Sequence, residues 1–321
     1  MADQNLILSR PAQVNKTGDA DALFLKLFAG EVLTAFKEVN IMEGLHKTRT
    51  ISHGKSASFP VLGKASARYH VPGTPILGSN QIATHERVIN IDDLLIADVA
   101  IYDLEDAKNH YDVRGEYSKQ LGWALAREFD QKTMRVAVLA ARTAGLIDDE
   151  PGGSVIKGGP TVATDGEVLA EAIFSCAQIW DEKDVLDWER FLILKPSQYY
   201  LLNQTTKVLN KDWNGGGSYK DGQIEAIGGV KIRKSNNVPS TNIAAATSGE
   251  KNTYHGDFTN TVGIGFQREA IGTVKLKDLV VQQSGADFNV MYQSTLMVGK
   301  YAMGHGILRP ACAIEISKET A

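Results

Sequence analysis

The chain has 321 residues, of which 43% are hydrophobic and 22% charged. This composition is typical of a folded globular protein and excludes a disordered or disulfide-stapled one. Its 34 Lys and Arg residues against 38 Asp and Glu residues give a formal charge of −4, which argues against binding nucleic-acid phosphates through bulk positive charge. Cys176 and Cys312 form no Cys-x-x-Cys pair. With no signal-peptide core and no long apolar run, we expect a protein of a reducing cytoplasm that spans no membrane.

The first 55 residues are expected to form an arm. Residues 1–20 are mostly polar, and Asp21 is placed to cap a helix that follows. From there apolar side chains recur at three- and four-residue spacing, which predicts an amphipathic helix over about 21–38. The side chains of its apolar face are Phe24, Leu27, Phe28, Val32 and Phe36.

A basic, proline-containing stretch follows the arm. No acidic residue occurs between Glu43 and Glu86, although the same stretch carries several cations. Pro60, Pro72 and Pro75 prevent regular pairing as a central strand. A segment of this length without a helix is usually functional or buried against another molecule. We therefore expect a long extended hairpin over about 56–90.

A long helix is the next expected element, over about 112–144. Leu121, Leu125 and Phe129 repeat at four-residue spacing, no proline interrupts the pattern, and Gly145 ends it. The run 87–103 before it has the composition of a strand. After a turn-rich junction at 146–160, the patterns predict a helix at 168–180, a buried strand at 190–196, a short helix at 197–203 and a strand at 228–235. Long strands are expected at 270–283 and 288–306, and together these elements indicate an α+β fold.

Motifs that carry chemistry are missing from the sequence. The run 52–58 ends like a phosphate-binding loop, but Arg49 stands where the first glycine is needed. Asp106 and His110 lie four residues apart, which is too few ligands for a specific metal site. Asp92 and Asp93 are adjacent in a strand and should point to opposite faces, so we interpret them as structural. We predict no catalytic residue, no cofactor and no metal.

Five segments of the chain resemble one protein family. The residues at 23–36, 52–65, 86–122, 272–282 and 300–313 are similar to the major capsid proteins of short-tailed, double-stranded DNA podoviruses of the T-seven type. The resemblance implies the Hong-Kong-97-type phage capsid fold. It would comprise an N-terminal arm at 1–55, an extended loop at 56–90, a peripheral domain at 91–162 and 261–321 with the spine helix at 112–144, and an axial domain at 163–260.

The same resemblance implies a function in assembly. Such proteins form hexamers and pentamers that close an icosahedral shell around double-stranded DNA, usually through a scaffold-assisted procapsid that expands. The implied partners are other copies of the chain, a scaffolding protein, the portal vertex and packaged DNA bound without sequence specificity. The implied location is the virion capsid, assembled in the cytoplasm of a bacterial host.

Charge suggests how neighbouring subunits could meet. We hypothesise that the cations Arg49, Lys64 and Arg68 of the hairpin pair across the interface with acidic residues around the start of the spine helix, and that Phe59 and Val61 are apolar anchors. A single exposed ion pair contributes only about 0 to 1 kcal/mol, so repetition over many copies would be needed. The acidic set is Asp103, Glu105, Asp106, Asp112 and Glu116.

Other assignments follow from the family likeness. The inner-arm helix at 21–38 would contact the inner surface and the scaffolding protein. Lys64 lies in the loop that carries crosslinks in some shells, but no motif specifies a partner, so we expect no covalent crosslink. A glycine-rich loop at 211–222 is expected at the capsomer centre, because glycine adapts to both five- and six-fold packing. Its residues are Trp213, Gly215, Gly216, Gly217 and Tyr219.

Two alternatives remain open at this point. An encapsulin-like compartment shell would share the fold and enclose protein cargo instead of a genome. A soluble α/β enzyme would place its site around 190–235, with Lys195, Tyr199 or Lys231 as reactive groups, although no nucleophile, base and oxyanion donor are spaced as a set.

Overall fold

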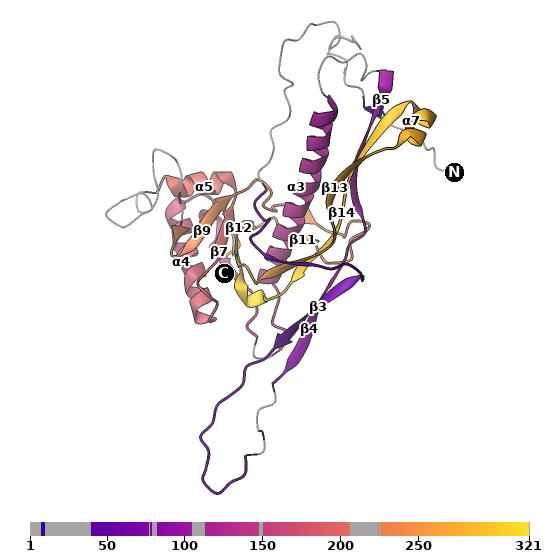
Figure 1. Ribbon diagram of the computed structural model, residues 1–321. Coiled ribbons are helices and arrows are strands. Elements are labelled where there is room, and N and C mark those ends of the chain that lie inside the picture. Colours follow the sequence, from indigo (N-terminus) through magenta and orange to yellow (C-terminus); the bar gives the residue numbers. More distant parts are fainter. Residues whose placement is uncertain are drawn as a thin grey trace. The chain divides into compact units, whose positions relative to one another are not determined.

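The computed structural model describes residues 8–9, 40–76, 78, 82–104, 113–147, 150–205, 224 and 226–320 (Figure 1). The chain divides into two compact units. The first comprises 1–39, 93–129 and 277–302, and the second comprises 40–92, 130–276 and 303–321. Helix α3 (Val113–Ala141) and strands β13 (Ile271–Gln283) and β14 (Ser294–Ile307) contribute residues to both units.

The first unit is built on an antiparallel ladder. Strand β5 (Leu95–Tyr102) pairs with β14, with Ser294 opposite Tyr102, and β1 (Leu8–Ser9) runs parallel to β5. Ile101, Leu121 and Met297 form its buried cluster, so one turn of α3 covers the ladder. The full sheet has the order β1-β5-β14-β13-β2, and β2 (Lys47–Thr50) pairs parallel with the part of β13 in the second unit.

One expected strand is partly helical. The sequence pattern predicts a single strand over 288–306, but α7 (Ala286–Tyr292) occupies its first residues and β14 begins only at Ser294. Gln293 separates the two elements in the left-handed conformation, with φ 50°. The prediction was wrong because alternation over a few residues does not distinguish a strand from two helical turns.

The second unit contains a six-stranded sheet. Its order is β6-β15-β12-β7-β9-β8, and α4 (Gly166–Glu182) and α5 (Pro196–Asn203) cover one face (Figure 1). All five residues of β7 are buried, which explains the apolar run Phe191–Leu194 that follows Arg190. The strands are β6 (Ser154–Lys157), β7 (Arg190–Leu194), β8 (Ala226–Ile227), β9 (Val230–Lys234), β12 (Thr261–Gln267) and β15 (Ala313–Ser317). Smaller elements are β10 (Asn242–Ile243), β11 (Gly256–Asp257), and 3-10 turns at Pro160–Ala163 and Pro310–Cys312.

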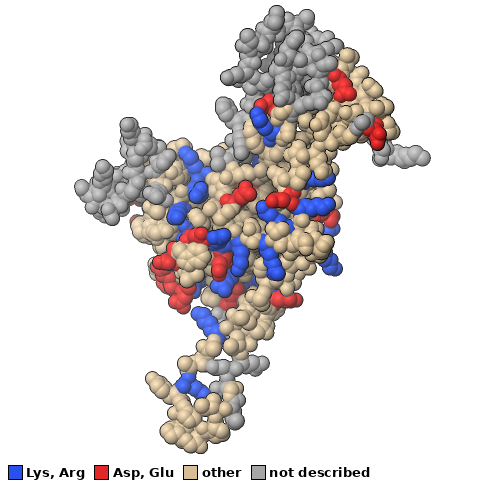
Figure 2. Space-filling view, viewed as in Figure 1, with Lys and Arg blue, Asp and Glu red and all other residues tan. Residues whose placement is uncertain are grey.

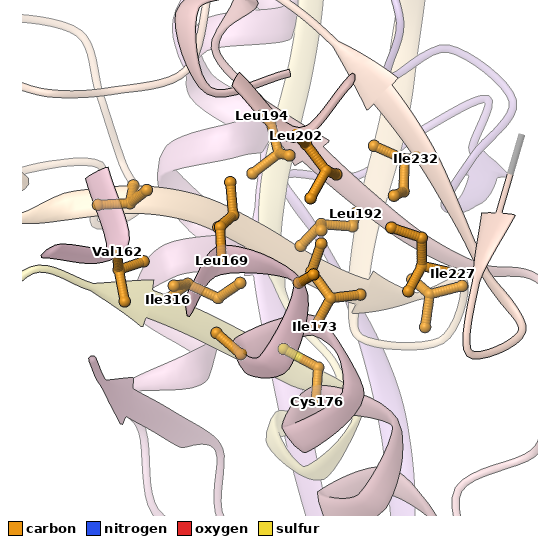
Figure 3. Close-up of a cluster of buried hydrophobic side chains, with 14 of the residues drawn as sticks. Val162, Leu169, Ile173, Cys176, Leu192, Leu194, Leu202, Ile227, Ile232 and Ile316 are labelled. Atoms are coloured by element: carbon orange, nitrogen blue, oxygen red, sulfur yellow. The ribbon is translucent and has the colours of Figure 1, made fainter. Parts of the chain in front are cut away.

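Helix α4 forms the core of this unit together with the sheet. Asp165 caps the helix by accepting a hydrogen bond from the backbone N–H of Glu167. Leu169, Ile173 and Cys176 recur at helical spacing and point into the cluster (Figure 3). Leu192 and Leu194 of β7 and Ile316 of β15 meet them from the sheet.

Most expected elements of the second half of the chain are confirmed. The helix expected at 112–144 is α3, those at 168–180 and 197–203 are α4 and α5, and the strands at 190–196 and 228–235 are β7 and β9. Residues on both sides of position 260 share one hydrogen-bonded sheet, because β12 pairs antiparallel with both β15 and β7. Among the described helices, none is long and apolar enough to cross a membrane.

Candidate assembly interface

A two-stranded hairpin is the most exposed part of the second unit. Strand β3 (Ser56–Leu62) pairs antiparallel with β4 (Thr84–Asn90), with Leu62 opposite Thr84. Pro60 is tolerated because a two-stranded sheet leaves an edge where its missing N–H faces no partner. The expected hairpin is therefore present. Its second strand is β4, and the segment from 63 to 83 connects the two strands.

The base of the hairpin is anchored in a small apolar cluster. Ala57 of β3 and Ile89 of β4 are buried with Val274 of β13 and Leu308. Strand β14 passes so close to the end of β4 that a Cβ on Gly304 would lie 1.8 Å from the carbonyl oxygen of Asn90. Glycine is therefore required at this position, and the hairpin base cannot shift without disturbing β14.

Buried polar groups fix the hairpin base further. The Asp92 carboxylate accepts hydrogen bonds from the Tyr254 hydroxyl at 2.6 Å, the Asn252 amide at 3.0 Å and the backbone N–H of Lys251 at 2.9 Å. The Tyr254 oxygen in turn accepts from the backbone N–H of His305 at 2.9 Å. Burial and the nearby Asp92 charge raise the pKa of Tyr254 well above its usual range. Asp92 is thus a structural residue, as expected.

Two histidines continue this network in one hydrogen-bonding arrangement. His46 Nδ1 lies 2.8 Å from the Met42 carbonyl and must carry its proton, so Nε2 accepts from the Thr273 hydroxyl at 2.6 Å. Thr273 then accepts from His305 Nδ1 at 2.8 Å. Both rings are neutral in this arrangement. Burial lowers the pKa of His46 to about 4 and lowers the pKa of His305 well below 6.5.

The first residues of the second unit are held by a second carboxylate. Asp130 of α3 is buried and accepts hydrogen bonds from the backbone N–H groups of Ile41 and Met42, at 2.9 and 3.1 Å, and from the Asn237 amide. Burial raises the pKa of Asp130, and these hydrogen bonds partly offset the shift. The sequence offered little signal for it, because a single Asp in a long helix looks like a solvated residue.

The connecting segment beyond the hairpin strands exposes large apolar side chains. Tyr69 is fully exposed at 100%, Ile76 is 77% exposed, Leu62 69% and Val71 64%. Exposed apolar side chains of this size are a common feature of protein interaction sites. We call residues 62–83 the hairpin tip.

The sequence-derived hairpin residues separate into two groups. Arg49 lies over the Phe59 ring at 5.6 Å and donates to the Ser58 carbonyl, and Phe59 packs on the apolar cluster of its own subunit. Val61 is half-buried. Lys64 pairs with Asp184 at 3.7 Å, with both side chains more than two-thirds exposed. Arg68 is exposed and has no ion pair within the described part of the chain. Of these three cations, Lys64 and Arg68 are therefore the more available, and the fully exposed Tyr69 is a neighbouring aromatic residue that pattern reasoning did not single out.

The acidic partners proposed from sequence are only partly described. Asp103 accepts from the Thr295 hydroxyl at 3.2 Å, and Glu116 pairs with Lys119 at 2.6 Å. Both acids thus have partners within their own chain. Outside the described residues lie Glu105, Asp106, Asp112, Phe24, Leu27, Phe28, Val32, Phe36, Trp213, Gly215, Gly216, Gly217 and Tyr219.

Among the described residues, the three reactive groups considered for an enzyme are not grouped as a catalytic site. Tyr199 is buried and bonded to the backbone of Ile224, Lys231 is exposed on β9, and Lys195 follows β7. Burial raises the pKa of Cys176 to about 12 and that of Cys312 to about 11, so neither forms a reactive thiolate. Within the same residues, no three His, Cys, Asp or Glu side chains are grouped as a metal would need.

Comparison with known proteins gives a consistent result. Residues 58–317 match the family model of the Gp10A-like major capsid proteins. The chain is 34% identical to the major capsid protein of Escherichia phage T7 over 92% of both proteins, and 34% identical to that of Enterobacteria phage T3 over 92% of this chain and 91% of that protein.

Solved structures agree with the sequence comparison. The capsid structure of the cyanophage P-SCSP1u has a TM-score of 0.86 and 46% identity, covering 99% of this chain and 100% of that one. The mature capsid of bacteriophage PhiM1 shares the fold, with a TM-score of 0.76 at 19% identity over 97% of this chain and 96% of that one. The fold is thus the Hong-Kong-97-type capsid fold, and the protein is structural rather than enzymatic. With its exposed hairpin and its match over most of its length, the chain belongs to the Gp10A-like family of phage major capsid proteins.

Proposed function

We propose that this capsid protein assembles as hexamers and pentamers into an icosahedral shell around double-stranded DNA, through a scaffold-assisted procapsid that expands. The observation that carries the proposal is the hairpin tip, whose apolar side chains are exposed in a subunit with a well-packed core. Burying such surface against another copy removes apolar area from water at about 25 cal/mol per Å².

The reach of the hairpin tip suits a contact with a neighbour. Each side of the connecting segment has about ten residues, and an extended chain spans at most about 3.3–3.6 Å per residue, so the tip can reach about 35 Å beyond the strands. Tyr69 and Arg68 combine an aromatic ring with a cation, which is the composition of strong interface contacts. The anionic partner we propose remains the acidic stretch around the start of α3 in the next subunit.

Other partners belong to the same proposal. The inner-arm helix at 21–38 would bind the scaffolding protein, the portal would occupy one vertex, and packaged DNA would be bound without sequence specificity. The formal charge of −4 supports a container that does not hold phosphates tightly. Assembly would take place in the cytoplasm of a bacterial host.

Reversing one charge tests the hairpin contact. We expect Arg68→Glu to lower the yield of closed shells at least tenfold while leaving the melting temperature of the subunit unchanged, because Arg68 contacts no described acid in its own subunit. Arg68→Lys keeps the charge and serves as the matched control. Shell yield is measured by sedimentation and negative-stain electron microscopy with the scaffolding protein present. A wild-type yield from Arg68→Glu would refute this role of the hairpin tip.

A further inference from the structure

Four lysines lie at one end of the six-stranded sheet because of the directions in which its strands run. Strand β6 is parallel to β15 and β7 is parallel to β9, while β12 runs antiparallel to both β15 and β7. The carboxyl ends of β6, β15, β7 and β9 therefore lie along the same edge. The residues that end or follow these strands are Lys157, Lys318, Lys195 and Lys234. We call this row the lysine edge.

Most of this charge is not neutralised by the subunit. Lys157 pairs with Glu319 at 3.9 Å, but no ion pair of Lys195, Lys234 or Lys318 is found within the described residues. Burial lowers the pKa of Lys195, and the nearby Lys318 charge lowers it further. Lys195 thus carries its charge near the like charge of Lys318.

An aromatic surface adjoins the lysine edge. Lys234 lies over the Tyr200 ring at 4.6 Å and donates to its hydroxyl at 2.7 Å. Tyr200 is nevertheless 48% exposed. A half-exposed tyrosine beside cations is a surface that favours an aromatic residue accompanied by carboxylates.

The opposite end of the same sheet carries acidic residues and exposed apolar side chains, which complement the cations and the tyrosine of the lysine edge. Residues 181–189 lead from α4 into β7, and Leu186 and Trp188 are about half-exposed there. Figure 2 shows acidic side chains gathered at the lower left, below the region of α5, with cationic side chains above them. The exposed acids of this segment are Asp181, Glu182, Asp184 and Asp187. We call residues 181–189 the acidic loop.

The acidic loop is held rigidly by a buried arginine. Arg190 donates to the carbonyl oxygens of Val185 and Leu186, and it pairs with Asp181 at 2.8 Å. Its guanidinium also lies over the Trp180 ring at 5.6 Å. A preorganised loop loses little conformational entropy when it binds a partner.

We propose that the acidic loop of one copy docks on the lysine edge and Tyr200 of the next copy, head to tail around the capsomer. The two surfaces lie at opposite ends of β7, a strand of five residues that spans about 17 Å, so they cannot meet within one chain. A contact between two different surfaces of identical subunits generates a ring when the rotation closes. This inference rests on the proposed function, because it presupposes that copies form capsomers.

Charge reversal at both ends provides the test. The acidic-loop variant Glu182→Lys/Asp187→Lys and the lysine-edge variant Lys195→Glu/Lys318→Glu should each reduce shell yield at least tenfold. The chain carrying all four substitutions should recover at least half of the wild-type yield, because opposite charges again face each other. Recovery is a readout that a merely structural role of these residues would not give. Wild-type yield from either reversal, or no recovery in a folded fourfold variant, would overturn the inference.

A second experiment uses the unchanged protein. A carbodiimide joins carboxylates to lysine amines that are in direct contact, so wild-type shells should yield peptides linking 181–189 to Lys195, Lys234 or Lys318 in mass spectrometry. Shells without such links would overturn the head-to-tail contact and leave the proposed function intact. Absence of shells from the wild-type protein would instead overturn the proposed function on which the contact rests.

Discussion

Single buried groups determine how firmly the second unit holds its hairpin. Asp92, Tyr254, Thr273 and two histidines form a continuous network whose donors and acceptors are matched only when His46 is neutral. A proton on Nε2 of His46 would leave the Thr273 hydroxyl between two donors. The network therefore makes stability depend on pH.

We expect the free energy of unfolding to fall as the pH drops below about 6.5. The folded-state pKa of His46 is depressed to about 4, so the unfolded state binds more protons between these values. His46 alone contributes about 3 kcal/mol that is present above pH 6.5 and lost as the pH falls towards 4. The raised pKa of Asp130 acts in the opposite direction in the acidic part of this range.

Urea unfolding of the subunit at pH 7.5, 6.0 and 5.0 measures this dependence. His46→Asn keeps a donor for the Met42 carbonyl and should be less stable at pH 7.5 with a flatter pH profile. His70→Gln changes an exposed ring and is the matched control. Equal pH slopes in the wild type and His46→Asn would show that the buried ring does not titrate as described.

A buried ion pair provides a second prediction for single residues. Glu315 is fully buried on β15, where Arg142, the residue after α3, donates to it at 2.6 and 2.7 Å and Thr261 donates at 2.6 Å. Glu315→Gln removes the negative charge beside Arg142 and turns one acceptor oxygen into an N–H2 group that faces an Arg142 donor, so it should cost about 3 kcal/mol in unfolding free energy. Glu319→Gln, at an exposed pair with Lys157, should cost no more than about 1 kcal/mol. Similar losses from both changes would contradict the assignment.

At the scale of elements, we expect the hairpin tip to be needed for shell assembly but not for folding of the subunit. Replacing residues 64–82 by a short Gly-Asn-Gly turn keeps the hydrogen bond from Gly63 to the Ala83 carbonyl, and every side chain that the structure describes within this segment is exposed. We expect a folded monomer whose melting temperature lies within a few degrees of wild type, and no closed shells. Gel filtration and thermal unfolding measure the two outcomes. A shortened chain that unfolds or still closes shells would contradict the separation.

Elements with a strong local pattern could be predicted from the sequence. Helices α3, α4 and α5 and the buried strands β7 and β9 follow from periodicity and from turn residues at their ends. Helix α7 over 286–292 could not be predicted, because a segment of seven residues fits both the helical period and the alternation of a strand. Sheet order was also out of reach, since the pairing of β12 with both β7 and β15 depends on residues far apart in the chain.

The sequence could locate the hairpin segment of the candidate interface, but it could not identify which of its residues are free to contact a neighbour. The lack of acids between Glu43 and Glu86 identified the hairpin, but pattern reasoning placed Phe59 among the anchors, and the structure packs it on its own core. The sequence could not indicate which face of β3 is covered, because that depends on Val274 and Leu308 from distant strands. The lysine edge could not be predicted either, because it depends on the alignment of strands that are far apart in the sequence.

For the whole molecule, we expect the shell to be held by non-covalent contacts alone. Lys64 is exposed and lies near an aspartate of its own chain. Mature shells denatured in detergent should therefore give one band at the subunit mass. A ladder of covalent dimers and larger rings would show that the hairpin forms crosslinks instead.

In the proposed assembly, the hairpin of each subunit lies on the next subunit of the closed shell. Cryo-electron microscopy of particles made by the wild-type protein with its scaffolding protein tests this most directly. We expect closed icosahedral particles in which Arg68 and Tyr69 lie against an adjacent copy. Persistent monomers, or closed particles whose hairpin tip faces solvent, would contradict it.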